Sequence, residues 1–411
     1  MGSPATVTPN VFRRVFKAFH YRDFRLMFTG ACISSIGTWM QSLAQAWLVF
    51  DMSKSPFILG LDAFLAGIPI FFLSLVGGVV AARVERRRVL LMSQYVQMVF
   101  AFTLTTLLLF KSVHIWEILA LSFLTGLAQS FGGPAYSALI PSLVSKDDIP
   151  NAIALNSIQF NVARALGPAI GGLALNSLGA VWCFGLNGLS FVAPVISLLL
   201  LHTRFKPEKT KESMLASMKQ GFRFIRHQGA MEGLVVLGFC VTALGIPMTT
   251  FLPVFARDIF HGGPGTFTLF MCASGGGAVA GGLAVAFLGN IRHKGRLALT
   301  MLATSGFGVA GFALSKSLPL SCLLLFVSGV SLMMVFTNVF SLVQLITGNE
   351  MRGRVVSVYN TAFRGGMPMG NLMTGWLVPM FTAPVVLAVN GLLLVLLGMY
   401  FLMVERKVAS L

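Results

Sequence analysis

Long apolar segments, separated by short polar or basic stretches, run through the whole chain. Each segment holds about 20 or more mostly apolar residues, the length that an α-helix needs to cross the hydrocarbon core of a bilayer. At about 30 residues for each span and its loop, a chain of 411 residues has room for about a dozen spans. We predict transmembrane helices at 24–47, 56–80, 89–110, 116–138, 152–176, 181–202, 231–255, 266–290, 297–315, 319–343, 355–378 and 384–404.

The predicted spans form two sets of six. The first set occupies 24–202, the second occupies 231–404, and a polar stretch at 203–230 joins them. Within this linker, 213–227 has the pattern of an amphipathic helix that lies on a membrane surface. Its apolar face consists of Met214, Met218, Phe222 and Ile225. Residues 1–23 predict a second surface segment of this kind, and 405–411 form a short tail.

Two short patterns recur in corresponding spans of the two sets. Arg164-x-x-x-Pro168 in the fifth span returns as Arg364-x-x-x-Pro368 in the eleventh. A pair of glycines precedes a basic loop after the second span, at 77–78, and again after the eighth, at 281–282. Such repeats indicate an internal duplication. We therefore predict an all-α integral membrane protein with two pseudo-symmetric six-helix bundles.

The composition excludes a water-soluble protein. The mean hydropathy is +0.82 and 10% of the residues are charged, whereas soluble domains are about a quarter charged. The chain shows no phosphate-binding loop and no clustered His, Asp and Glu residues of the kind that enzyme sites use. We therefore predict no enzymatic activity, no cofactor and no metal. The five cysteines lie inside apolar segments, and we expect them to be reduced thiols.

The net charge of +17 comes from basic residues that gather at the ends of the apolar segments. With the N-terminus in the cytoplasm, 24 of the 30 Lys and Arg residues fall on the cytoplasmic side. The opposite side holds Lys54, Lys111, Arg257 and Lys316. This positive-inside distribution places both termini in the cytoplasm. We predict a multi-pass protein of the bacterial cytoplasmic (inner) membrane, in contact with lipid, and no binding of nucleic acid.

The segment 78–88 resembles the signature loop of the major facilitator superfamily. That loop has a Gly, three residues, Asp-Arg, one residue, and then Gly-Arg-Arg or Gly-Arg-Lys. Gly78, Arg83, Arg86 and Arg87 match it, Ala82 stands where the Asp is usual, and Glu85 stands at the second Gly. We expect this loop to act as a gate whose charges contact neighbouring helix ends, with Glu85 replacing the missing Asp. The alternative is a positively charged anchor alone. The candidate gate residues are Gly78, Arg83, Glu85, Arg86 and Arg87.

Further segments, taken in order, resemble one branch of this superfamily. They lie at 155–157, 161–172, 186–191, 253–258 and 352–355. The branch is that of drug:proton antiporters, which includes enterobactin-exporter-like and macrolide-efflux proteins. Within 161–172, the run from Gly167 to Gly172 resembles the exporter motif of the fifth span, although Ala154 and Ala163 replace two of its glycines.

The resemblance implies a secondary active transporter that works by alternating access. Its expected partners are a small amphipathic organic solute, either drug-like or a siderophore, and protons as the coupling ion. We expect a monomer that exports the solute. A second hypothesis is a flippase for lipids or lysophospholipids. A hypothesis of another class is a membrane sensor or enzyme that transports nothing.

Two carboxylates are candidates for proton coupling. Asp62 lies about two turns into the second span, where a carboxyl group in a medium of low dielectric constant can take up a proton near neutral pH. The alternative is that Asp62 is a hydrogen-bond partner of Gln41 or Gln45 in the first span. Glu117 lies near the outer end of the fourth span, where it is either a second proton site or a solvated surface residue.

Two arginines lie in the middle of spans, where inserting a charge costs about 2.5–3.5 kcal/mol. At 100° per residue, Arg164 shares a helix face with Asn156 and Gln159, and Arg364 shares one with Asn360 and Asn371. In one interpretation these faces line a central cavity, where the arginine pair binds an anionic or carbonyl-rich solute. The alternative for Arg164 is a buried side chain bound by helix-end carbonyls, and for Arg364 it is a contact that holds the two halves together through backbone carbonyls. The candidates for a cavity or gate are Arg164, Arg364, Asn156, Gln159, Asn360, Asn371, Gln41 and Gln45.

Overall fold

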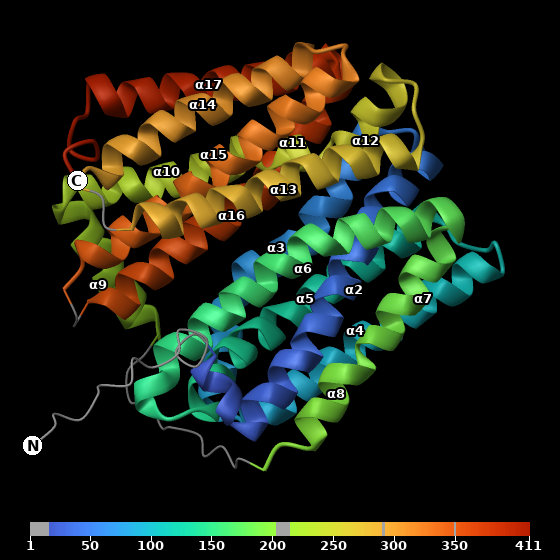
Figure 1. Cartoon of the computed structure of the whole chain (residues 1–411), viewed down its shortest axis with the longest axis horizontal. Helices are drawn as coiled ribbons and strands as arrows, with labels where there is room; N and C mark the ends of the chain where they lie inside the picture. Colours follow the sequence, from blue (N-terminus) through green and yellow to red (C-terminus); the bar gives the residue numbers. More distant parts are fainter. Residues whose placement is uncertain (1–15, 203–213, 290–291, 349–350) are drawn as a thin grey trace, which may run out of the picture.

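The computed structural model describes residues 16–202, 214–289, 292–348 and 351–411, and this part of the chain contains helices and no strand. The helices form two bundles that lie one above the other in Figure 1. The N-terminal bundle comprises α2 (Arg22–Ser53), α3 (Pro56–Arg83), α4 (Arg86–Leu109), α5 (Ile115–Leu139), α6 (Ile149–Ser177), α7 (Ala180–Ser190) and α8 (Val192–Leu199).

The C-terminal bundle follows a linker helix, α9 (Met214–His227). It comprises α10 (Gly229–Gly245), α11 (Pro247–Thr250), α12 (Leu252–Val254), the π-helix η4 (Phe255–Ile259), α13 (Pro264–Leu288), α14 (Lys294–Leu314), α15 (Leu318–Leu345), α16 (Arg352–Phe381) and α17 (Ala383–Met403). The sixth predicted span is two helices in line, α7 and α8. The seventh is broken into four pieces because Pro247 and Pro253 lack the backbone N–H that a continuous helix needs.

The same helix pairings occur in both bundles. In the N-terminal bundle α3 packs on α5, α2 on α6, and α4 on α5 and α7. The corresponding pairs in the C-terminal bundle are α13 with α15, α10 with α16, and α14 with α15 and α17. This equivalence, pair by pair, confirms the predicted pseudo-symmetric fold of two six-helix bundles.

Nine helical segments in the described residues are long and apolar enough to cross a membrane. The remaining long helices, α2, α6 and α16, contain 32, 29 and 30 residues, more than the roughly 20 that a span requires. They fall short only in apolar content, because they carry many polar and small side chains. Large apolar side chains such as Phe72, Trp182 and Phe287 are exposed on the outside of the bundles, as a lipid-facing surface requires.

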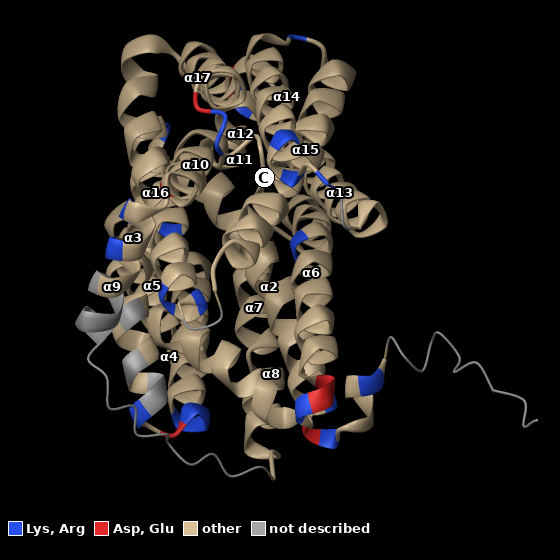
Figure 2. Cartoon of the chain, turned by 90° about the vertical axis from the view of Figure 1, so that its left-hand side faces the viewer, with Lys and Arg blue, Asp and Glu red and all other residues tan. Residues whose placement is uncertain are grey.

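Basic residues mark one end of the helices, which we call the basic end; it includes Arg22, Arg86, Arg226, Lys294 and Arg354. Figure 2 views the molecule from this side and shows many Lys and Arg residues with few Asp and Glu. The opposite end, which we call the far end, carries Lys54, Lys111, Arg257 and Lys316. Successive long helices run in opposite directions between the two ends (Figure 1).

The two bundles meet mainly through two pairs of helices, α3 with α16 and α6 with α13. Small residues allow a close approach: a Cβ atom on Gly60 would lie 2.5 Å from the carbonyl oxygen of Asn371 and 3.0 Å from Cα of Gly375. Between α3 and α16, close contacts extend from this position at the far end to the contact of Phe71 with Gly365. Between α6 and α13, they extend from the contact of Gly265 with Asn176 to the contact of Gly275 with Ala165.

Toward the basic end the same helix faces lose contact with the other bundle. Gly78 lies two turns beyond Phe71 on α3, and a Cβ atom there would meet nothing within 4 Å. Ile158 lies two turns from Ala165 on α6, and its side chain is exposed. The bundles are therefore packed together from the far end to the middle and separate toward the basic end.

The linker and the tail both pack on the C-terminal bundle. Gly221 of α9 lies against Arg354 and Val358 of α16, and Ile225 is buried while Phe222 is exposed. Of the predicted apolar face, the side chains of Met214 and Met218 lie outside the described part. In the tail, Val408 is fully buried, and the backbone N–H of Gly295 donates to the carbonyl of Leu411 at 3.4 Å.

The predicted N-terminal surface segment lies mostly outside the described residues. From residue 16 onward the chain forms a short 3-10 helix, η1 (Lys17–His20). Phe19 packs on Phe28 of α2, with ring centroids 4.8 Å apart. The backbone N–H of Ala18 donates to Asn151 Oδ1 of α6 at 2.9 Å, so this short helix is held on the N-terminal bundle.

Candidate functional site

Asp62 is at the centre of a polar cluster inside the N-terminal bundle. Its side chain is 7% exposed. Gln45 of α2 donates from Nε2 to both carboxyl oxygens, at 3.2 and 3.0 Å. Ser122 of α5 donates its hydroxyl to Oδ1, and Gln45 Nε2 also lies 2.8 Å from the Ser122 hydroxyl oxygen. Three helices thus contribute one polar side chain each.

Uncharged groups hold the Asp62 carboxyl group. Within the described residues it forms no ion pair, since its partners are an amide and a hydroxyl. A buried charge without an opposite charge is costly, so such a carboxyl group can alternate between a protonated and an ionised state with each change in its surroundings. The predicted alternative role, a hydrogen bond with Gln45, is present in the structure, and the use of Asp62 for proton coupling stays a prediction.

Glu117 lies in the first turn of α5 and caps that helix. Its Oε2 accepts a hydrogen bond from the backbone N–H of His114 at 2.8 Å, and the two residues form a reciprocal capping box. The His114 ring nitrogen Nδ1 lies 3.6 Å from Glu117 Oε1. This position at the far end gives Glu117 a structural task, and its use as a proton site stays a prediction.

Three of the predicted cavity residues join helices of the N-terminal bundle to one another. Gln41 accepts a hydrogen bond from Asn187 of α7 at 2.6 Å. Asn156 accepts one from the Tyr136 hydroxyl of α5 at 2.6 Å. Gln159 is buried and donates to the carbonyl of Ala31 in α2 at 3.1 Å. Their amide groups are committed to these partners within the bundle.

The residues around Arg164 on α6 face two neighbouring helices. Gln159, Gly167 and Gly171 face α2, whereas Gly172 and Ala165 face α13 of the other bundle. Arg164 lies between these two directions, because it is 100° from Ala163 and 100° from Ala165. Its side chain is partly exposed and, within the described residues, forms no hydrogen bond or ion pair.

The face predicted for α16 is also divided, but along its length. Asn371 is fully buried where α16 meets α3, and neither atom of its amide has a partner in the described residues. Asn360 and Arg364 lie nearer the basic end, where the bundles separate, and both are exposed. Like Arg164, Arg364 forms no hydrogen bond or ion pair in the described part of the chain. The structure thus leaves two mid-span arginines unpartnered.

The predicted gate residues span the end of α3 and the start of α4. Arg86 donates to the carbonyl of Ala138 in the last turn of α5 at 3.0 Å. Arg87 donates to the carbonyls of Leu199 and Leu201 at the end of α8, at 2.9 and 3.4 Å. Guanidinium groups at helix C-termini are favourable because those carbonyls are unpaired and carry partial negative charge.

Glu85 pairs within its own segment, with Arg88 Nε at 2.8 Å. Arg83 is exposed at the last residue of α3, and Gly78 faces open space. All the described contacts of these five residues lie inside the N-terminal bundle. In this conformation the motif ties the ends of α4, α5 and α8 together, and its use as a gate between the bundles stays a prediction.

An ion pair between the bundles was missed at the far end. Asp51 and Arg257 were predicted to be loop residues, but Arg257 Nη1 is paired with Asp51 Oδ1. Lys54 Nζ lies 2.7 Å from the same carboxyl oxygen. Nearby, Trp47 of α2 stacks on Phe267 of α13 with ring centroids 6.0 Å apart. No local pattern could have revealed this pair, because its members are about 200 residues apart in sequence.

Asp51 lies beyond the predicted first span, at the far end of the molecule. Partial burial acts to raise the pKa of the carboxyl group, but hydrogen bonds and charges from Lys54 and Arg257 outweigh it, so the pKa lies below its ordinary value of 3.8. The carboxylate of Asp51 is therefore ionised throughout the physiological range.

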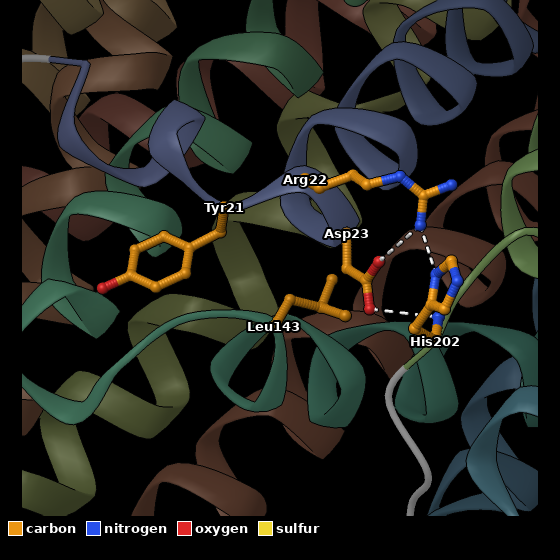
Figure 3. A pocket seen from close by; sticks show the side chains of 5 residues that line it. All are labelled: Tyr21, Arg22, Asp23, Leu143 and His202. Carbon is orange, nitrogen blue, oxygen red and sulfur yellow. Dashed lines mark hydrogen bonds and ion pairs between the residues drawn. The ribbon is translucent and has the colours of Figure 1, made fainter.

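A hollow of about 600 Å³ lies at the basic end of the N-terminal bundle, lined by Tyr21, Arg22, Asp23, Leu143 and His202. Figure 3 shows Arg22 reaching the His202 ring and Asp23 accepting from the His202 backbone N–H, at 3.2 Å. The hollow lies between the start of α2 and other residues at the basic end of the N-terminal bundle. It lies away from Asp62 and from both mid-span arginines, so it is no part of the site that those residues form.

The described residues show no group of His, Cys, Asp and Glu that could hold a metal ion. All five cysteines are free thiols. The charged side chains that lie deep inside the predicted spans are Asp62, Arg164 and Arg364.

The chain is similar over nearly its whole length to known exporters. A family model described as transmembrane secretion effector, of the major facilitator superfamily, matches residues 15–410. The enterobactin exporter EntS of Shigella boydii is 26% identical over 388 residues, which cover 93% of this chain and 91% of that protein. EntS of Citrobacter koseri is 26% identical over 387 residues, covering 92% and 91%.

Solved structures of transporters share the fold. A bacterial homologue of the human lysosomal transporter Spinster, in an inward-facing and unoccupied conformation, superposes with a TM-score of 0.74 at 12% identity, covering 94% of this chain and 96% of that one. The nucleoside transporter NupG superposes with a TM-score of 0.69 at 13% identity, covering 93% and 98%. With its two matching six-helix bundles and a family match from end to end, this chain is a multi-pass membrane transporter that belongs to the transmembrane secretion effector family of the major facilitator superfamily.

Proposed function

We propose that this protein exports an amphipathic, siderophore-like organic solute from the bacterial cytoplasm in exchange for protons. The observation that carries the proposal is the contact between the bundles, which is tight from the far end to the middle and, among the described residues, is lost at Gly78 and Ile158. A solute could thus enter between the bundles from one side only. Rocking of the bundles would then expose it to the other side.

The basic end faces the cytoplasm in this proposal, with both termini on that side, because positively charged segments are retained there. The described conformation is then open to the cytoplasm and ready to receive a solute for export. The enterobactin exporters among the relatives support both the direction and a siderophore-like solute. The protein would act as a monomer, since each bundle supplies half of the route.

Asp62 is the proposed proton carrier. Only three of the 13 acidic residues fall inside the predicted spans, and two of these, Glu117 and Glu232, stand at the second residue of their span. Asp62 alone lies deep, about 9 Å along α3 from its first residue at 1.5 Å per residue. Its partners are neutral, so a proton taken up there removes a charge that the bundle otherwise has to stabilise.

Transport into everted membrane vesicles tests the function. Vesicles that contain the protein should accumulate enterobactin when a proton gradient, acidic inside, is imposed, and an uncoupler should abolish the accumulation. Vesicles without the protein serve as the control. Accumulation that ignores the uncoupler would refute proton coupling. Transport of labelled lysophospholipid in place of enterobactin would instead support the flippase hypothesis.

A further inference from the structure

The two mid-span arginines occupy equivalent places in the two bundles. Arg164 is the 16th residue of the 29 in α6, and Arg364 is the 13th of the 30 in α16, so both lie near the middle of their helices. Each precedes by one turn a buried proline, Pro168 or Pro368. Internal repeats of transporters place their substrate sites at this depth, at the junction of the repeats.

Both arginines also lie where the contact between the bundles ends. The carbonyl of Arg164 and the Cα of Ala165 are each 3.7 Å from a Cβ atom built on Gly275 of α13. Arg364 is adjacent to Gly365, which lies against the ring of Phe71 in α3. These are the last detailed contacts before the bundles separate. The two guanidinium groups therefore border the region that opens toward the basic end.

Neither guanidinium group has a partner of its own. The alternatives predicted from the sequence are not formed within the described residues: Arg164 binds no helix-end carbonyl, and Arg364 binds no backbone carbonyl of the other half. A guanidinium group stays charged at all accessible pH values and offers five N–H donors. An unpaired charge inside a membrane protein is costly, and such residues normally pair or line a solute pathway.

Within the described residues, no acidic side chain pairs with either arginine. Asp62 is the only deep carboxyl group in the predicted spans, and it points away from the other bundle. It is two residues from Gly60, or about 200° around α3, and Gly60 is the residue that touches α16. Its carboxyl oxygens are bound by Gln45 and Ser122. The facing surfaces of the bundles are thus positively charged at mid-depth.

We propose that Arg164 and Arg364 form an anion-binding pair and that the transported solute is an amphipathic anion. The two planar guanidinium groups would each bind an oxygen pair of a carboxylate or sulfonate group, or the oxygen of a phenolate, on the solute. Aromatic and thioether side chains for its apolar part lie one turn from each arginine, namely Phe160, which packs on Trp39 with ring centroids 6.0 Å apart, and Met367, which is exposed. This inference rests on the proposed function and specifies its solute class.

A pair of dyes with one xanthene core and opposite charge tests the proposal. Fluorescein is an anion and tetramethylrhodamine methyl ester is a cation, so the two compare charge at similar size and aromatic character. Binding to the purified protein in detergent is measured by fluorescence anisotropy, without any ion gradient. We expect fluorescein to bind at least tenfold more tightly than the cation. Equal binding, tighter binding of the cation, or no binding of fluorescein would overturn the proposal.

Variants show whether the arginines cause the preference. Arg164→Gln and Arg364→Gln should each weaken fluorescein binding about tenfold, the loss of about 1.4 kcal/mol, and the double variant should bind both dyes equally. Arg164→Lys should lose less than Arg164→Gln, because it keeps the charge but not the forked geometry. Arg296→Gln removes the same charge from the exposed start of α14 and should leave both affinities unchanged.

The controls separate a binding role from a structural one. Binding of the cationic dye reports whether each variant is folded, because removing a positive charge should leave it equal or improve it. A Gln variant that keeps full affinity for fluorescein would overturn the proposal even if vesicle transport succeeds. Failure of proton-driven transport, with the anion preference intact, would refute the proposed coupling and leave the anion site standing.

Discussion

Asp62 illustrates how a single residue combines a cost with a use. Its carboxyl group is 7% exposed and held by Gln45 and Ser122 alone. Neutral donors can stabilise the ionised form without locking it, whereas an Arg or Lys partner would hold the group permanently ionised. The cluster therefore suits a group that must gain and lose a proton in each cycle.

Replacing Asp62 by Asn tests whether the carboxyl group carries the coupled proton. The Asn side chain has nearly the same shape and can still accept from Gln45 and Ser122, so we expect the variant to fold and to bind solute. Accumulation driven by the proton gradient in everted vesicles should fall at least tenfold, because the amide cannot carry the proton. Ser122→Ala, which keeps the carboxyl group, serves as the matched variant. Full gradient-driven transport by Asp62→Asn would exclude Asp62 from coupling.

Asp51 provides the contrasting case of a carboxylate fixed in its ionised form. Hydrogen bonds and charges from Lys54 and Arg257 hold its pKa below 3.8. A carboxylate with a depressed pKa contributes its stabilisation above the ordinary value and loses it as the pH falls below that value. The ion pair with Arg257 should therefore keep the far end closed at neutral and mildly acidic pH.

The closure of the far end can be measured as the distance between spin labels at Ser112→Cys and Lys316→Cys. These positions lie one on each bundle at the far end, and the labels are placed in a variant without the native cysteines. The distance between the labels should stay constant from neutral pH down to about the ordinary Asp value of 3.8 and lengthen below it. Asp51→Asn should remove that acid transition. A change in the neutral range would instead show that another group controls the closure.

The sequence identified most of these residues but not their surroundings. A polar residue in an apolar span is recognisable in isolation, so Asp62, Arg164 and Arg364 stood out. Its neighbours depend on helix rotation, and a face about 140° wide can point at two partners. For that reason the sequence does not reveal that Gln41, Asn156 and Gln159 join helices within one bundle, and their place beside a cavity stays a prediction.

At the scale of helices, the approach of α3 to α16 depends on residues without bulky side chains. Gly60 lies against the backbone of Asn371 and Gly375, and Gly67 lies 3.1 Å, measured from a built Cβ atom, from Cβ of Pro368. Close approach of this kind stabilises helix pairs in membranes through van der Waals contact. The contact also closes the far end, so its strength sets how readily the bundles can rock.

Gly60→Val should act as a wedge between these helices. Its added atoms would meet backbone rather than a movable side chain, and such overpacking costs about 1–3 kcal/mol. We expect the far-end spin-label distance to lengthen and the closed population to fall. Gly133→Ala is the matched control, because a Cβ atom on Gly133 meets nothing within 4 Å. An unchanged distance in Gly60→Val would show that this contact does not control closure.

The helices themselves were well predicted, and their interruptions less so. Apolar length locates a span regardless of what it packs against, so all twelve units appear close to their expected places. The break of the seventh span at Pro247 and Pro253 and the division between α7 and α8 at Phe191 depend on local backbone geometry. The signature motif also extends farther into helices than expected, because α3 continues to Arg83 and α4 begins at Arg86.

For the whole molecule, the ion pair of Asp51 with Arg257 is a bias on the closed state rather than a lock. The two side chains are 47% and 34% exposed, and exposed pairs contribute about 0.2–1 kcal/mol. Such an energy changes the ratio of closed to open molecules by at most about fivefold. The larger share of closure must come from the helix contacts and from the stacking of Trp47 on Phe267.

Charge reversal separates the contribution of the Asp51–Arg257 ion pair to closure from that of its surroundings. Arg257→Asp and Asp51→Arg should each lower the closed population, seen as a longer far-end spin-label distance, because like charges then face each other. The double reversal should restore closure in part, since the pair is re-formed with opposite polarity. Arg223→Asp, on the exposed face of α9, provides the same charge change at a distance. Equal effects of the single and double reversals would mean that the pair makes no contribution.

The unpartnered arginines have an electrical consequence. Moving one elementary charge through a voltage of 100 mV changes the energy by about 2.3 kcal/mol. Two guanidinium groups at mid-depth shift within this field whenever the empty bundles rock, and an inside-negative voltage favours the conformation that brings them nearer the cytoplasm. A bound anion cancels their charge. The unloaded return step should therefore depend on voltage, while the loaded export step should be nearly electroneutral.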